Sequence, residues 1–120
     1  MKYVWLDEYL MSKKGVQKDF KAEWNWQRYM INDKMFAALC FDDDNKETLI
    51  TLKLDPMDGE FLRNQYDDII PGYYMNKVHW NSIKVDGAVP DDLLKEMLDK
   101  SYNLILKSFS RKKQAEILGG

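Results

Sequence analysis

The side chains best suited to chemistry lie in one short segment, residues 71–80, which has the sequence PGYYMNKVHW. It contains the only histidine of the chain, His79, next to a lysine, an asparagine, two tyrosines and a tryptophan. Histidine is the side chain whose ordinary pKa lies nearest neutrality, so His79 is the one acid–base candidate. No recognisable nucleophile accompanies it. We therefore expect a structural or binding role for this histidine rather than a catalytic one.

An amide, an ammonium and an imidazole held on one turn suit an anionic group such as phosphate. We predict that three polar residues of the segment point outward: Asn76, Lys77 and His79. Three other residues are expected to be buried anchors: Tyr73, Met75 and Trp80. Two cations from neighbouring elements are candidates to extend this surface: Lys53 and Arg63.

The sequence predicts no metal and no cofactor. The acidic run at residues 42–44 resembles the start of a calcium loop, but Lys46 and Lys53 occupy positions where that loop needs oxygen ligands. One histidine and one cysteine cannot form a structural zinc site, and no glycine-rich phosphate loop precedes a helix. Cys40 lies in an apolar run, so we expect a buried structural thiol.

Composition limits the partners. A chain of 120 residues with 45% apolar residues forms one domain, residues 1–120. The net charge of −2 and pI near 5.4 argue against a typical basic nucleic-acid binder. Four cations near the end of the chain are interpreted as a solvated helix face: Lys107, Arg111, Lys112 and Lys113.

The beginning of the chain bears on location. Residues 1–7 contain no long uncharged apolar stretch, so we expect neither a signal peptide nor a membrane span. A cytoplasmic location is therefore expected.

Apolar spacing and turn residues predict the elements that hold these side chains. Helices are expected from Trp5 to a C-cap at Gly15, from Asp55–Pro56 onward, from Pro90 to a buried Phe109, and after Ser110. Strands are expected at residues 24–31, 34–41, 50–54 and 80–85. Strands in the middle with helices at both ends predict an α+β fold of two layers, with helices on one face of an antiparallel sheet.

The segment at residues 71–80 resembles the PGYHMNKxHW signature of the MmcQ/YjbR family. Further likenesses occur at residues 34–37 (KMFA), 52–56 (LKLDP), 86–94 and 101–102. One departure is Tyr74, which stands where many members have a histidine, so nothing that needs two histidines is carried over. The resemblance implies a YjbR-like fold, similar to the α-β-α fold of secretion chaperones, and the DNA-binding label that the family often carries.

Three hypotheses follow. The first is a non-enzymatic binding protein whose partner is DNA, bound weakly and in a salt-sensitive way. The second is a protein-interaction or chaperone-like adaptor with a protein partner, and the third is a small-molecule binder or enzyme. A continuous basic face would favour the first, an exposed apolar groove the second and a closed pocket around His79 the third.

Overall fold

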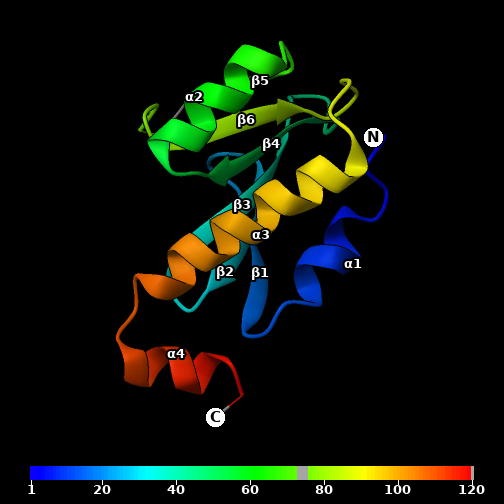
Figure 1. Ribbon diagram of the computed structural model, residues 1–120. Coiled ribbons are helices and arrows are strands. Elements are labelled where there is room, and N and C mark those ends of the chain that lie inside the picture. Colours follow the sequence, from blue (N-terminus) through cyan, green and yellow to red (C-terminus); the bar gives the residue numbers. More distant parts are fainter. Residues whose placement is uncertain (73–75, 120) are drawn as a thin grey trace.

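The structure, a computed structural model, describes residues 1–72 and 76–119 (Figure 1). Its elements, in chain order, are α1 (Leu6–Met11), β1 (Val16–Lys21), β2 (Trp26–Ile31), β3 (Lys34–Phe41), β4 (Glu47–Lys53), α2 (Pro56–Gln65), β5 (Ile69–Pro71), β6 (Trp80–Lys84), α3 (Asp91–Lys107) and α4 (Arg111–Ile117).

The described strands form one antiparallel sheet in the order β1-β2-β3-β4-β6-β5. Helix α3 crosses the sheet diagonally, with α1 beside it and α2 over β5 and β6 (Figure 1). Leu6 of α1, Leu62 of α2 and Leu94 of α3 all enter the same hydrophobic core. These helices therefore cover one face of the sheet, and the predicted two-layer α+β fold is confirmed.

Side chains along β4 point alternately to the two faces of the sheet. Ile50 and Leu52 are fully buried in the core under the helices, while Thr51 and Lys53 point to the opposite side. We call this opposite side of the sheet the open face. A second, smaller apolar cluster lies there, and its buried members are Trp26, Ala38 and Cys40. All of them come from strands, as expected for the face opposite the described helices.

Local signals at helix ends are confirmed. The side chain of Asp55 accepts a hydrogen bond from the backbone N–H of Met57, and that of Ser110 accepts one from Lys113. An N-cap acceptor satisfies one of the N–H groups that the first turn of a helix leaves unpaired. Sequence reasoning therefore located the starts of α2 and α4.

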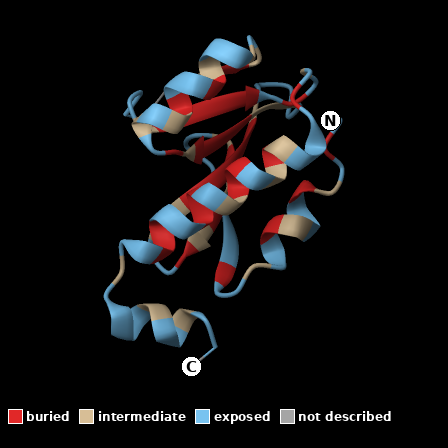
Figure 2. Ribbon diagram, in the orientation of Figure 1, coloured by how far each residue is buried: buried red, intermediate tan, exposed pale blue. Residues whose placement is uncertain are grey.

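Two predictions about elements were wrong, and the strands β1 and β5 were not predicted. Helix α1 ends at Met11 with Ser12 as C-cap, and Gly15, at a φ of 78°, instead leads into β1. Strand β1 was missed because its only buried residue is Val16, which leaves no apolar alternation to detect. Phe109 is only half-buried, since α3 ends at Lys107. Burial falls sharply beyond that point, and α4 has no buried residue (Figure 2).

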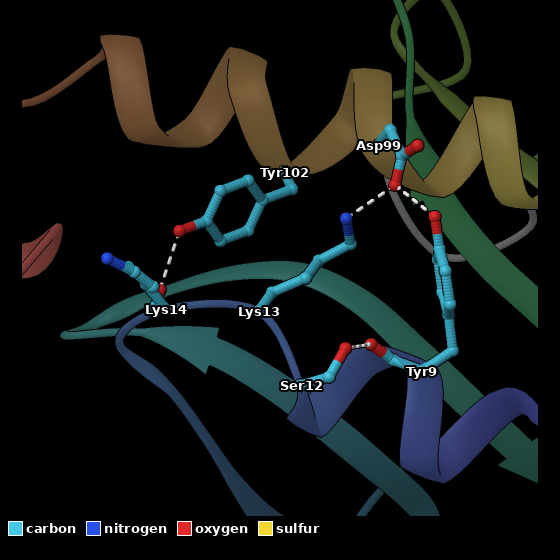
Figure 3. A network of polar contacts seen from close by, with 6 residues as sticks. All are labelled: Tyr9, Ser12, Lys13, Lys14, Asp99 and Tyr102. Atoms are coloured by element: carbon cyan, nitrogen blue, oxygen red, sulfur yellow. Dashed lines mark hydrogen bonds and ion pairs between the residues drawn. The ribbon is translucent and has the colours of Figure 1, made fainter.

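A polar network joins α1 to α3 (Figure 3). The hydroxyl of Tyr9 donates to Oδ1 of Asp99 at 2.6 Å, and the ammonium of Lys13 donates to the same oxygen. The Tyr102 hydroxyl donates to the carbonyl of Lys14 at 2.6 Å. Burial, together with the bond to Asp99, raises the pKa of Tyr9 to about 12. Tyr9 therefore stays protonated at neutral pH and donates its hydrogen bond to Asp99, which links α1 to α3.

A second network joins α1 to the sheet. Oδ1 of Asp7 accepts hydrogen bonds from the ammonium of Lys18 at 2.9 Å and from the hydroxyl of the fully buried Tyr29 at 2.8 Å. The bond from Lys18 is the main reason why the pKa of Asp7 lies below its usual 3.8. A lowered carboxyl pKa means that the stabilisation is present above pH 3.8 and is lost as the pH falls through the folded-state value.

We expect Asp7→Asn to remove this part of the acid sensitivity. Because the Asp7 side chain is 51% exposed, solvent screening limits the effect to about 1 kcal/mol or less. The measurement is the free energy of unfolding at pH 7 and at pH 2–3 for both proteins. Asp33→Asn, at an exposed turn, is the control and should keep the wild-type pH dependence. An unchanged difference between the two pH values in Asp7→Asn would contradict the assignment.

Candidate functional site

The open face brings together residues that are distant in the sequence. Register places Thr51 between Ala38 and Ser82, and it places Lys53 opposite Trp80. The middle of this face is a row of small side chains that are almost completely buried: Ala38, Thr51 and Ser82. We call this row the floor of the open face. Trp26 lies toward one end of the floor and Trp80 toward the other.

Backbone hydrogen bonds hold the 76–80 part of the segment at the Trp80 end. The N–H of Leu54 donates to the carbonyl of His79 at 2.8 Å, and the N–H of Gly72 donates to the carbonyl of Trp80 at 2.8 Å. A Cβ on Gly72 would lie 2.9 Å from Cβ of Trp80, so a larger residue would clash there. The segment is thus attached to the ends of β4 and β6, next to Lys53.

Asn76 shapes this turn. Its side-chain Oδ1 accepts the N–H of Val78 at 2.9 Å, and its carbonyl accepts the N–H of Trp80 at 2.9 Å. Asparagine commonly forms such turns because its side chain mimics a backbone carbonyl. Asn76 and Lys77 are exposed and His79 is half-buried. Lys77 and His79 therefore offer polar groups to a ligand, whereas the Asn76 oxygen is engaged within the turn.

Arg63 does not join this surface. Its guanidinium donates to Oδ1 of Asn81, which pairs with the core-facing Leu52. Arg63 therefore lies on the helix side of the sheet and Lys53 on the open face. The four C-terminal cations, Lys107, Arg111, Lys112 and Lys113, are all exposed on the end of α3 and on α4, as a solvated helix face should be.

Among the predicted anchors, Trp80 is 9% exposed, which confirms its burial. Tyr73 and Met75, like Tyr74, lie outside the described residues.

Sequence reasoning missed a hollow of about 610 Å³ at the Trp26 end of the open face. Two hairpin turns form its rim, and β3, β4 and β6 form its floor. Its lining residues, which define the Trp24 hollow, are Ala22, Glu23, Trp24, Asn25, Trp26, Cys40, Phe41, Asp42, Asp43, Thr48, Leu49, Thr51 and Ser82. The one sequence signal was the pair of tryptophans separated by a single residue at positions 24–26.

The floor of the hollow is a chain of small polar groups. The Thr51 hydroxyl lies 3.0 Å from that of Ser82 and 3.6 Å from the sulfur of Cys40. Burial raises the pKa of the Cys40 thiol to about 11, so the thiol is protonated at neutral pH. Cys40 is the buried structural thiol that the sequence predicted.

Across residues 1–72 and 76–119, no group of three or more histidine, cysteine, aspartate or glutamate side chains is arranged to hold a metal ion. None of the helices in the same part of the chain combines the length and the apolar character needed to cross a bilayer.

Sequence comparison identifies a family. The family model described as YjbR matches residues 11–104. The chain is 30% identical over 95 residues to the uncharacterized protein YjbR of Escherichia coli K12, a match that covers 79% of each protein. It is 32% identical over 75 residues to the uncharacterized protein YyaQ of Bacillus subtilis, covering 62% of this chain and 63% of YyaQ.

Solved structures share the fold. The crystal structure of the Deinococcus radiodurans protein DR2400, described as a DUF419 domain, superposes with a TM-score of 0.82 at 30% identity, covering 93% of this chain and 84% of that one. A Pseudomonas syringae protein superposes with a TM-score of 0.69 at 24% identity, covering 87% of this chain and 98% of that one. The latter likeness concerns the fold alone.

Proposed function

The chain belongs to the YjbR family, and we propose that it is a non-enzymatic binding protein that contacts DNA weakly at the Trp80 end of its open face. Lys53, Lys77 and His79 are the contact residues in this proposal, and Asn76 positions the turn that carries two of them. We propose that it acts in the cytoplasm of a bacterium, and the bacterial origin of its relatives supports the second part of this proposal.

One observation carries the proposal: the attachment of residues 76–80 to the end of β4. The N–H of Leu54 bonds to the carbonyl of His79, and Lys53 pairs with Trp80. Together these contacts place Lys53 of β4 beside residues 76–80. A lysine is a point charge suited to phosphate, and phosphate contacts account for most non-specific affinity for DNA. Turns held on a rigid sheet are frequent positions for recognition.

The chemistry of the described side chains supports a role without catalysis. A nucleophile must be activated by a nearby base or a lowered pKa. The one cysteine is buried with a raised pKa, and burial also raises the pKa values of Tyr3, Tyr29 and Tyr102. His79 has no activated nucleophile beside it among the residues that the structure describes.

The test is a titration of labelled duplex and single-stranded DNA at two salt concentrations. We expect an affinity no tighter than roughly 10⁻⁴–10⁻⁶ M at physiological salt, falling steeply as salt rises. Lys77→Ala should weaken binding similarly for unrelated sequences and flatten the log–log salt slope for duplex by about 0.9, because one phosphate contact is lost.

Lys46→Ala is the matched control, since Lys46 is an exposed lysine in the acidic β3–β4 turn. It should leave the salt slope unchanged. Absence of binding at low salt would remove DNA as the ligand, and an equal effect of both variants would remove the assigned surface.

A second candidate, a protein-interaction adaptor, is favoured by the charge of the open face. Besides Lys53, this face carries Lys84, Lys21 and the paired Asp19 and Arg28, while the rim of the Trp24 hollow is acidic. The carboxylates of this rim would repel a long polyanion that runs along the whole face. If DNA does not bind, the adaptor role becomes the leading proposal.

A further inference from the structure

We propose that the Trp24 hollow binds a short basic segment of a protein partner, with an arginine or lysine side chain lying against Trp24. This site lies at the end of the open face away from residues 76–80. It does not depend on the DNA contact, and it takes a ligand of opposite charge.

The shape of the hollow is fixed by a link between its two turns. The side-chain amide of Asn25 donates to the carbonyl of Asp42 at 2.8 Å, and the N–H of Phe41 donates to the carbonyl of Asn25 at 3.0 Å. Asn25 has a φ of 58°, in the left-handed region that asparagine tolerates. The β1–β2 and β3–β4 turns are therefore joined, and the rim that they form is preorganised.

The walls offer aromatic surface. Trp24 is 48% exposed and packs edge to face against the buried Trp26, with ring centroids 5.2 Å apart. A large exposed tryptophan supported by a second one is typical of recognition sites. The volume of about 610 Å³ lies within the range of ligand-binding clefts and exceeds what one side chain fills. The hollow therefore has room for a segment of a few residues.

Charge decides which segment fits. Among the described residues, the lining contains three carboxylates, those of Glu23, Asp42 and Asp43, and no lysine or arginine. Two cations lie just outside the lining over the Trp24 ring: Lys21 at 4.8 Å and Arg28 at 5.9 Å from the centroid. Each is already matched by a carboxylate, Lys21 by Glu23 at 3.6 Å and Arg28 by Asp19 at 2.6 Å.

The two aspartates of the lining have no such match. Neither Asp42 nor Asp43 forms an ion pair with another described residue; Oδ1 of Asp42 instead accepts two backbone N–H groups of its own turn. An incoming cation would meet these two carboxylates, which no described cation pairs, on one side. On the other side it would meet the exposed part of the Trp24 ring, beside the two cations that already lie over that ring. The apolar stem of arginine or lysine suits the ring, and its head suits the carboxylates. Nucleic acid is disfavoured here because its phosphates would face three carboxylates.

The test is a titration of ¹⁵N-labelled protein with a capped tetra-arginine peptide, followed by NMR. We expect shifts at the Trp24 indole and at the backbone N–H groups of residues 23–25 and 42–43, with a Kd on the order of 1 mM. A tetra-glutamate peptide should cause no shifts there. Trp24→Ala should weaken binding about two- to fivefold, and Asp43→Asn about twofold or more.

Asp33→Asn, in the exposed β2–β3 turn, is the matched control and should not change the Kd. The proposal fails if tetra-arginine causes no shifts at several times that concentration, if the shifts lie outside the hollow, or if all three variants weaken binding equally. It also fails if an oligothymidine causes the same shifts and Asp43→Asn strengthens its binding, since the hollow would then stack bases.

Discussion

Replacing Trp80 by alanine should destabilise the protein by about 3–5 kcal/mol, the usual cost of removing a large aromatic side chain from a packed site. Trp80 is 9% exposed, begins β6 and lies against Gly72, and its N–H and carbonyl both bond to the loop. The variant would leave a cavity where the 76–80 turn meets the sheet. Equilibrium denaturation with urea measures the loss directly.

Trp24→Ala is the matched control, since it removes the same side chain from a site that is 48% exposed. Its cost should be about 1 kcal/mol or less, because exposed positions contribute little to stability. If Trp80→Ala cost no more than this, Trp80 would not anchor the turn. It would then belong to the binding surface, and the DNA titration would have to include it.

Sequence patterns predicted those parts of the fold that depend on neighbouring residues. The N-caps at Asp55 and Ser110 act within three residues, and the alternation of Ile50 and Leu52 needs only the period of a strand. Strand β1 lacks this information, because it lies at the sheet edge with one buried residue. Strand β1 is defined by its pairing with β2, and no local sequence pattern predicts that pairing.

Some features of the candidate site could likewise be predicted from the sequence, and others could not. Asn76, Lys77 and His79 are close in sequence, so their proximity was predictable. The position of Lys53 beside Trp80, and the separation of Arg63 from both, depends on the register between β4 and β6. The Trp24 hollow depends on two turns joined through Asn25 and Asp42, which are 17 residues apart. Long-range pairing of this kind needs the folded structure.

The buried hydroxyl of Ser101 shows how α3 supports the binding surface from behind. It donates to the carbonyl of Phe36 in β3 at 2.5 Å and accepts the backbone N–H of Lys53 in β4 at 2.8 Å. Its residue is completely buried. One helix side chain therefore satisfies backbone groups of two strands, including the residue that the proposed DNA contact uses.

Ser101→Ala should cost about 2–3 kcal/mol, because it removes at once the partner of the buried Phe36 carbonyl and of the part-buried Lys53 N–H group. Ser82→Ala is the matched control: Ser82 is equally buried, but its hydroxyl meets the Thr51 hydroxyl, which can turn toward Cys40 instead. We expect that variant to lose about 1 kcal/mol. Urea denaturation of both variants gives the comparison, and equal losses would show that the Ser101 hydroxyl does not hold the strands. A larger loss for Ser101→Ala would make α3 the support that fixes Lys53 in place.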